Sequence, residues 1–561
     1  MRPRLRWLAW AAQPIVIAIV LWLMIDGPKR DVRYPLAFAG SGLVTLAEAR
    51  SVMDHGAWWT LPEIGTPPGA RTPLPLQHAH LDLMLVRAAS AMSRRPASVV
   101  NLAWMLMLIG MGASSSWCLR RLGVSEAGAW SAGVLFALSP FALNHNTHNF
   151  GMMPYLAPFA ATAALQLAVA RQLGDTRSRS RIMFAGVAIM GFNAILPAMF
   201  AAFFVALGSV AGYVRSRRRA PLVIGAALLL VIVIAGVVNL ATPGPNPAGP
   251  APNQVTAEMY GLKIRQLVTP IRGHWFPPFR SWALKDDEAH FPNGTDNDRL
   301  GLVATIGFLG LLVVFFVPSG SGRGDAGATT RAASRLLVAG LLFGTLGGFG
   351  TIFSLLISSA LDDFSGMTPF LAFFALAGLA LAVDRVTETP PWHRWRGAAW
   401  TAVLVIGLLD QSVATIPLRA TRLPIHAEVT QLRAFVDNLE GALRPGAMVL
   451  QLPPRAEMNV PVVRRMGIYD SFKPWLFSRS LRWSAPDGYG EHAGWQTAAM
   501  TLAAADMPAH FRREGFSAIV IDRHGFRDDG TAILGALQAG PQPAKLMMQD
   551  ARYVALDIRD K

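Results

Sequence analysis

The sequence is poor in charge and nearly free of cysteine. Charged residues make up 15% of its 561 positions, whereas a soluble domain usually has about 25%. The single cysteine, Cys118, excludes a disulfide within the chain and a metal site built from several cysteines. The sequence also lacks a Gly-x-Ser-x-Gly elbow, a phosphate-binding glycine-rich loop and a His-Glu-x-x-His motif. Nothing therefore indicates the familiar hydrolase, kinase or zinc-protease classes.

Long apolar runs recur from Trp7 to about Leu409 and then stop. A run of roughly 20 apolar residues can cross a bilayer as one helix. We therefore predict a polytopic α-helical membrane protein with about eleven transmembrane helices in residues 1–414. The predicted spans are 7–25, 98–117, 125–143, 153–170, 182–196, 198–214, 221–240, 301–317, 335–359, 367–384 and 397–414. The fifth and sixth spans share one apolar stretch, which is broken near Asn193 and Pro197.

Arginine clusters in the short loops orient these helices, because positive residues favour the cytoplasmic side. If the N-terminus is cytoplasmic, the clusters between closely spaced spans all fall inside, and the outer loops 144–152 and 360–366 contain neither lysine nor arginine. We therefore expect a bacterial inner-membrane protein with a cytoplasmic N-terminus and a periplasmic C-terminal domain. Arg94 and Arg95 resist this arrangement, because they lie just outside the second span.

The net charge of +16 has the same explanation. The arginines mark topology and contact anionic lipid headgroups. Nucleic-acid binding is not expected, because no basic face with interleaved aromatic residues is apparent.

Two long loops are predicted on the outer side. In the first, residues 26–97, the apolar positions from Leu43 to Met53 recur at helical spacing and predict an amphipathic helix on the membrane surface. A second amphipathic stretch runs from Leu81 to Met92. Such a loop can roof a cavity, and passive packing against the bundle is the alternative. The second loop, residues 241–300, begins with a proline-rich, extended stretch.

The remainder, residues 415–561, reads as a small α/β domain. Short apolar, β-branched runs at 446–452, 517–522 and 553–558 predict strands, and helical patterns at 429–442 and 495–514 precede the first two. Asp522 and Asp528 lie at or after a strand end, where ligands often bind in such sheets. A charged surface loop is the better explanation for these two residues.

Several motifs accompany this layout. They are Leu43 to Gly69, Arg121 to Ser125, Glu258 to Lys263, Phe343 to Gly350, Ser480 to Ser484 and Gly515 to Arg523. Together with the layout, they resemble the GT-C superfamily of integral-membrane glycosyltransferases, and more narrowly a group of bacterial membrane glycosyltransferases and sugar translocases. The resemblance implies a GT-C-like helical bundle followed by a periplasmic domain.

The resemblance also implies a function. The protein would move a sugar from a polyprenyl-phosphate donor to an envelope glycan or lipid acceptor on the periplasmic face. A translocase without covalent chemistry and a binding or assembly component for lipid-linked sugars are the alternatives. The scarcity of charged residues within the spans counts against an ion-coupled transporter. The oligomeric state is not predicted.

Glycosyl transfer needs a base that takes the proton of the acceptor. Asp31, just after the first span, is the preferred catalytic base, because the chain leaves the bilayer there and can point into a cavity. Glu48, on the predicted surface helix, is the second candidate. Interface solvation is the competing explanation for Asp31. Members of the resembled group have an acidic residue where this chain has Ser41. Either Asp31 or Glu48 takes its place, or the chain has lost transfer activity.

Candidate substrate-binding residues lie in two outer loops. Basic residues gather in the second long loop at Lys263, Arg265, Arg272 and His274, and such a group suits a lipid-linked phosphate. Ordinary headgroup contact is the alternative. Tyr260 precedes this group, and His145 and His148 lie in the outer loop 144–152, where helix capping competes with substrate contact.

No metal site is assigned. His78, His80 and Asp82 alternate, but the stretch reads as helical, and metal pairs on helices prefer a spacing of four residues. A divalent metal ion is compatible with glycosyl transfer as a cofactor, and no residues are predicted to bind it.

Overall fold

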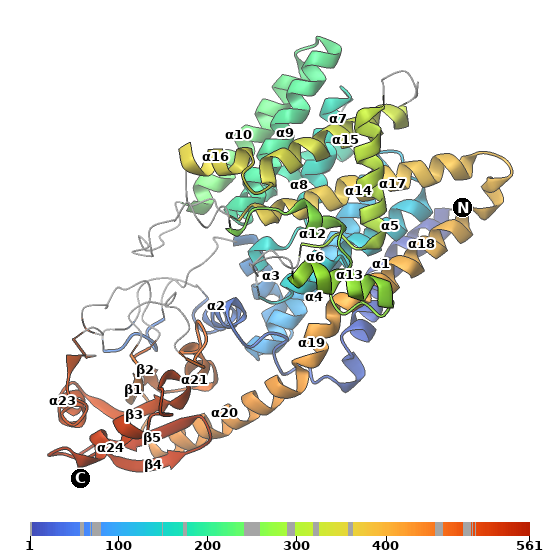
Figure 1. Ribbon diagram of the computed structural model, residues 1–561. Coiled ribbons are helices and arrows are strands. Elements are labelled where there is room, and N and C mark those ends of the chain that lie inside the picture. Colours follow the sequence, from blue (N-terminus) through green and yellow to red (C-terminus); the bar gives the residue numbers. More distant parts are fainter. Residues whose placement is uncertain are drawn as a thin grey trace.

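The computed structural model describes most of the chain. The described residues are 3–56, 61–67, 69, 80–148, 150–171, 177–240, 259–288, 298–317, 325–356, 363–454, 464–485, 495, 498, 499 and 501–560. They form a long helical bundle with a small sheet domain at one end (Figure 1). The proline-rich start of the second outer loop and His78 lie outside these residues.

Helices occupy each of the predicted spans. They are α1 (Pro3–Met24), α4 (Pro96–Arg121), α5 (Glu126–Ala137), α6 (Pro140–His145), α7 (Ala157–Ala168), α8 (Arg177–Ile189), α9 (Ile195–Ser216), α10 (Ala220–Leu240), α14 (Leu302–Phe316), α15 (Asp325–Gly344), α16 (Phe349–Leu356), α17 (Thr368–Glu388) and α18 (Arg396–Gln411). The predicted break near Asn193 separates α8 from α9. In the described parts of the chain, six helices are long and apolar enough to cross a membrane. The count of about eleven spans therefore stays a prediction.

The predicted span at 335–359 is broken by a turn in the structure. The apolar stretch at 335–359 forms α15 and α16, which are separated by a turn in which Gly347 has φ +69°. The second outer loop docks on this turn, because the Leu262 N–H donates to the Gly344 carbonyl (2.8 Å) and the Leu346 N–H donates to the Leu262 carbonyl (3.1 Å). The docked loop thus supplies hydrogen-bond partners to backbone groups left free at the end of α15.

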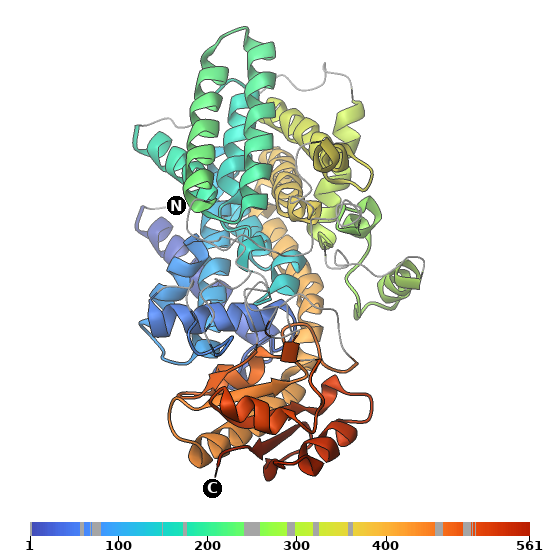
Figure 2. The ribbon, with the colours of Figure 1, turned by 90° about the vertical axis from the view of Figure 1, so that its left-hand side faces the viewer.

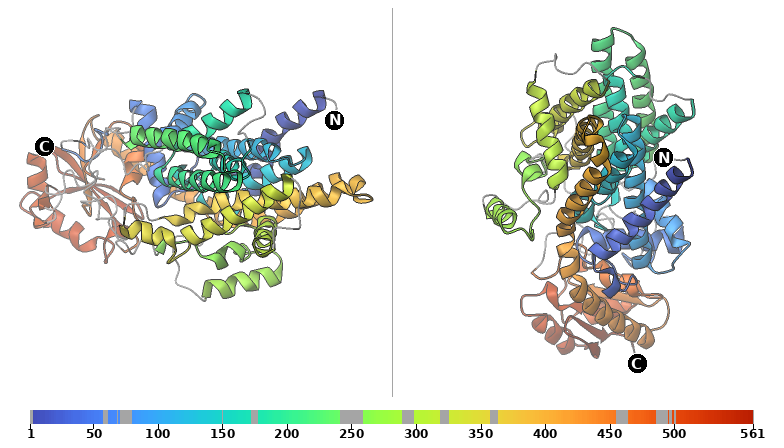
Figure 3. Two further views of the ribbon diagram at one scale, coloured as in Figure 1. Left: turned by 90° about the horizontal axis from the view of Figure 1, so that it is seen from above. Right: turned by 90° about the vertical axis from the view of Figure 1, so that its right-hand side faces the viewer.

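The sheet domain lies at one end of the helical bundle (Figure 2), and the view from above shows the N-terminus toward the other end (Figure 3). The chain enters the domain through α19 (Ile416–Ala420) and the long α20 (Arg422–Ala442). This arrangement is what a cytoplasmic N-terminus and a periplasmic C-terminal domain require.

The sheet has five strands in the order β2-β1-β3-β5-β4. β1 (Met448–Leu452) pairs in parallel with β2 (Arg482–Trp483) and β3 (Phe516–Asp522), whereas β5 (Tyr553–Asp557) pairs antiparallel with β3 and with β4 (Lys545–Gln549). The three predicted strands are β1, β3 and β5. Alternate residues face two cores: Val449 and Val520 share a core with α20 and the bundle, and Leu450 and Ile519 share one with α23 (Met507–Arg513) and α24 (Thr531–Ala539).

The described part of the first outer loop contains two α-helices, one of which connects the bundle with the sheet domain. They are α2 (Ser41–His55) and α3 (His80–Ser90). α2 packs against α3 and α4 on one side and against α21 (Phe472–Phe477) of the sheet domain on the other (Figure 1). Both of its faces are buried, whereas the amphipathic pattern predicted one exposed face.

Arg50 is the polar contact that holds α2 against the sheet domain. Its buried guanidinium donates to the backbone carbonyls of Trp475 and Ser478, the latter at 2.6 Å, and lies 4.4 Å from the centre of the Trp475 ring. An ion pair with Asp54 (3.1 Å) completes its contacts. Arg50 thus satisfies the backbone carbonyls at the end of α21 from a neighbouring helix.

The orientation can be tested with single cysteines in a Cys118→Ala background. Arg218→Cys places a thiol in the turn between α9 and α10, and Ala532→Cys places one on α24; both positions are exposed. We expect a membrane-impermeant maleimide to label Ala532→Cys in intact spheroplasts, and Arg218→Cys only after permeabilisation. The reverse pattern would invert the predicted topology.

Replacing Arg50 should loosen the sheet domain from the bundle. Arg50→Met leaves two backbone carbonyls without their charged donor, at a cost of about 3 kcal/mol. The melting temperature in detergent should fall, and a protease should cut the domain junction earlier than in the parent protein. Arg479→Met is the matched control, because the Arg479 side chain is 81% exposed. If both variants melt at the same temperature and resist proteolysis equally, Arg50 does not hold α2 against the sheet domain.

Candidate functional site

Glu48 is the one residue between Gly42 and Val52 of α2 that is not fully buried. Its carboxylate makes no hydrogen bond or ion pair with any described residue. A carboxyl group on an otherwise enclosed helix, partly open and without a fixed partner, is free to meet a ligand.

Asp82 and two tyrosines surround Glu48. Asp82, on α3, is buried, and its Oδ1 accepts a hydrogen bond of 2.5 Å from the hydroxyl of Tyr155, which precedes α7. The other oxygen of Asp82, Oδ2, is buried and accepts no hydrogen bond from a described residue. Tyr469 of the sheet domain completes the group: burial raises its pKa, and the negative charge of nearby Glu48 adds to the shift. We call these four residues the carboxylate cluster.

Burial changes the acidity of both carboxyl groups in this cluster. It raises the pKa of Glu48 to about 8, and the negative charge of Asp82 adds to the shift. Burial likewise raises the pKa of Asp82 to about 8, although the hydrogen bond from Tyr155 opposes the change. Two nearby carboxyl groups that resist ionisation can hold and release a proton near neutral pH.

Asp31 lies in a different environment. The Arg33 guanidinium is 2.7 Å from its carboxylate, and hydrogen bonds from Arg33 hold the pKa of Asp31 below its ordinary value. An ion-paired carboxylate with a lowered pKa is a weak base. Of the two predicted catalytic residues, the geometry favours Glu48.

The two predicted histidines lie beside the start of α2. The backbone carbonyl of His148 accepts a hydrogen bond from Thr45 (3.3 Å), and its ring lies against Gly42, where an added Cβ would be 3.3 Å from Nδ1. His145 stacks on Phe141, with ring centres 4.1 Å apart, and its Nδ1 bonds the Phe141 carbonyl. His148 is thus near the helix that carries Glu48, while His145 is held within α6.

The predicted phosphate-binding residues of the second loop are paired with acids. Arg265 contacts Asp286 (3.2 Å) and Arg272 contacts Asp287 (2.7 Å), both on α13 (Pro277–Glu288). His274 is buried 3.3 Å from Asp410. A phosphate would have to compete with these ion pairs.

The remaining residues of this loop make backbone contacts. The Tyr260 carbonyl accepts from the Ser365 N–H (3.1 Å), and Lys263 lies next to Leu262, which docks on the turn between α15 and α16. A phosphate role for Tyr260, Lys263 and the paired residues of this loop stays a prediction.

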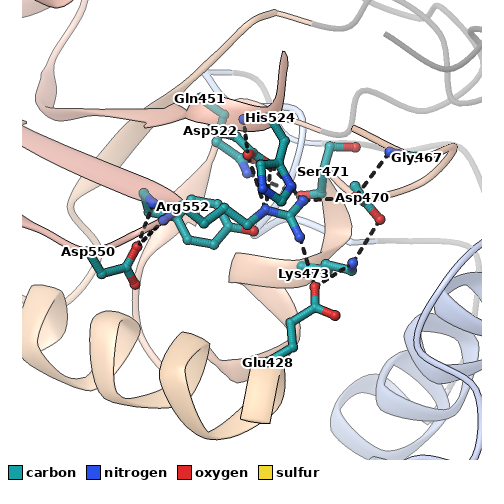
Figure 4. A network of polar contacts seen from close by, with 11 residues as sticks. Glu428, Gln451, Gly467, Asp470, Ser471, Lys473, Asp522, His524, Asp550 and Arg552 are labelled. Carbon is teal, nitrogen blue, oxygen red and sulfur yellow. Dashed lines mark hydrogen bonds and ion pairs between the residues drawn. The ribbon is translucent and has the colours of Figure 1, made fainter. Parts of the chain in front are cut away.

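The charged loop of the sheet domain is a network of ion pairs (Figure 4). Arg552 lies between Asp522 (2.7 Å), Asp470 (2.8 Å) and Glu428 (2.8 Å), and Lys473 contacts the latter two at 3.0 and 2.7 Å. This network fastens α20 and α21 to the sheet and occupies the strand end at Asp522. Asp528 caps α24, accepting from the Ala532 N–H at 2.6 Å. For both aspartates, the structure favours a structural role.

Sequence reasoning singled out Glu48 but not its partners. Asp82 was considered only as part of the alternating His78, His80 and Asp82 pattern, and Tyr155 was not predicted as a site residue. A hydrogen bond between residues 73 positions apart leaves no local pattern. Among the described residues, no group of three or more His, Cys, Asp or Glu side chains is placed to hold a metal ion.

No protein-family model matches the sequence, and a search of curated proteins also found no match. Solved structures do match. The structure of ArnT from Cupriavidus metallidurans bound to undecaprenyl phosphate aligns over 98% of this chain and 97% of its own, with 14% identity and a TM-score of 0.53. Its apo state gives the same score and identity.

A more distant match is the archaeal oligosaccharyltransferase AglB from Archaeoglobus fulgidus, in complex with an inhibitory peptide and a dolichol-phosphate. It covers 92% of this chain and 69% of its own, with 11% identity and a TM-score of 0.42. The alignment with ArnT runs through both the bundle and the C-terminal domain. The chain therefore shares its overall fold with ArnT, and the predicted architecture, a GT-C-like helical bundle followed by a C-terminal domain, is confirmed at the level of the fold.

Proposed function

We propose that this protein is a glycosyltransferase that moves a sugar from a polyprenyl-phosphate donor to a hydroxyl of an envelope glycan or lipid, on the periplasmic face of the bacterial inner membrane. The observation that carries the proposal is the carboxylate cluster within this fold. ArnT, which shares the fold, binds undecaprenyl phosphate, so a lipid-phosphate donor is consistent with the architecture.

Glu48 is the base in this proposal. The acceptor oxygen attacks the anomeric carbon, Glu48 takes the proton of the acceptor hydroxyl, and the bond between the anomeric carbon and the phosphate oxygen breaks. Polyprenyl phosphate leaves with the electron pair of that bond. Burial and the negative charge of Asp82 raise the proton affinity of Glu48, and thereby match it to proton transfer near neutral pH.

The position of Glu48 on α2 explains how it can serve without an acid at Ser41. Ser41, Thr45 and Glu48 are spaced by four and three residues, so they share one face of the helix. Glu48 thus projects toward the same side as Ser41, about two turns further along. We infer that the carboxylate has moved along the helix, while the face that it serves has not changed.

Glu48→Gln should abolish sugar transfer, whereas Asp31→Asn should leave it intact. The assay uses the full-length protein in proteoliposomes, a panel of radiolabelled undecaprenyl-phosphate sugars and a bacterial lipid extract as the acceptor. Loss of a positioned base costs about 10²- to 10⁴-fold in rate, and Asp82→Asn should give an intermediate loss. Undecaprenyl phosphate should still bind to Glu48→Gln, which serves as the folding control.

Full transfer by Glu48→Gln together with loss in Asp31→Asn would reverse the assignment. If the wild-type protein binds the labelled donors but transfers none, the translocase or assembly alternative holds instead.

A further inference from the structure

A second charged site lies on the other side of α2. A cavity of about 570 Å³ opens between the first outer loop, the start of α4 and the sheet domain. Six arginines line it: Arg33, Arg50, Arg94, Arg95, Arg433 and Arg479. Three acids, Asp54, Glu63 and Asp437, offset half of this charge. The cavity therefore carries a clear positive excess.

The arginines differ in how far they are neutralised. Arg33 and Arg50 have carboxylate partners in Asp31 and Asp54. In the described part of the chain, the guanidinium groups of Arg94 and Arg95 have neither a hydrogen bond nor an ion pair, and both side chains are exposed. These two residues are also the ones that the topology rule leaves unexplained, because they carry positive charge on the predicted outer side.

Arg433 is held in place for an anion. Its guanidinium lies 5.4 Å from the centre of the Phe477 ring and 5.9 Å from that of Tyr34, and no described carboxylate pairs with it. Stacking on aromatic faces fixes a guanidinium while leaving its edge free to donate hydrogen bonds. The N-terminus of α4, which begins at Pro96 on the wall of the cavity, adds the positive end of a 26-residue helix.

This cavity is distinct from the carboxylate cluster. Leu46, Arg50, Met53 and Asp54 of α2 face it, and they share one side of the helix. At about 100° per residue, Glu48 projects roughly half a turn away. An anion held by these arginines would therefore not be the phosphate that reacts near Glu48.

The cavity lies at the depth of lipid headgroups. Arg94 and Arg95 immediately precede α4, and Arg33 follows α1, so both charged edges lie where predicted membrane helices leave the bilayer. Apolar side chains, including Phe38, Leu476 and Phe477, form part of the same wall. A free phosphate ion would make no favourable contact with such an apolar wall, whereas the glycerol and upper acyl chain of a lipid would pack against it.

We propose that this arginine-lined cavity binds the phosphate of an anionic phospholipid headgroup. The two parallel N–H donors of a guanidinium group match two phosphate oxygens. Arg94, Arg95 and Arg433, which have no carboxylate partner among the described residues, supply such donors. The site requires no transfer chemistry, so it stands or falls independently of the role of Glu48.

The test measures binding of short-chain lipids to the purified full-length protein in detergent. The probes are dioctanoyl phosphatidylglycerol, dioctanoyl phosphatidylcholine and inorganic phosphate. The variant Arg94→Gln/Arg95→Gln removes two exposed, unpaired charges without disturbing the core. The control Arg217→Gln/Arg218→Gln removes two equally exposed charges at the turn between α9 and α10. Arg433→Gln is the third variant.

Phosphatidylglycerol should bind more tightly than phosphatidylcholine, and its Kd should rise at least about tenfold in Arg94→Gln/Arg95→Gln and in Arg433→Gln. The control should bind as the parent does. Unchanged affinity in both cavity variants, or an equal loss in the control, would overturn the site. If inorganic phosphate binds as tightly as phosphatidylglycerol and displaces it, the ligand is a free anion and the lipid assignment is wrong.

Discussion

The clasping of α2 between the bundle and the sheet domain is the contact on which the two charged sites depend. Arg50 supplies the polar part of this contact through Trp475 and Ser478, and the buried apolar residues from Gly42 to Val52 supply the apolar part. A helix held on both sides cannot rotate. Its two polar directions are therefore fixed: Glu48 faces Asp82 and Tyr469, and the opposite side faces the arginine-lined cavity.

This constraint also explains how an acidic residue becomes a base suited to neutral pH. Solvated carboxyl groups ionise far below pH 7, and ion-paired ones such as Asp31 lower still. The sheet domain contributes Tyr469 to the carboxylate cluster, and burial raises the pKa of Glu48 to about 8. In the proposed function the C-terminal domain would contribute to the chemistry through burial, whereas its own charged network around Arg552 is occupied by internal ion pairs.

Much of the bundle could be predicted from the sequence, because bilayer thickness fixes the length of an apolar run. The helices α4, α9, α10 and α17 follow directly from such runs, and the interruption at Asn193 was visible as a polar break. The strands β1, β3 and β5 were equally visible, since short β-branched runs stand out after a helical membrane region. The break between α15 and α16 was missed, because it depends on the docking of Leu262 from a distant loop.

The candidate site was harder to predict. Periodicity identified α2 but gave it an exposed face, since the second covering layer comes from α21, more than 400 residues later. The basic group at Arg265 and Arg272 suggested a phosphate, and their partners Asp286 and Asp287 lie on a separate helix. The pairing of Asp31 with Arg33 was local and could have been anticipated.

The most direct test of this account is the titration of Glu48 itself. Infrared difference spectra of the full-length protein between pH 6 and pH 10 would follow the carbonyl band of protonated carboxylic acids. With a pKa raised to about 8, Glu48 should be mostly protonated at pH 7, and the ionised fraction that can act as the base should grow as the pH rises through 8. The Glu48→Gln variant should lack this component. A Glu48 that is already ionised at pH 6 would contradict the enclosed, high-pKa base on which the proposed chemistry rests.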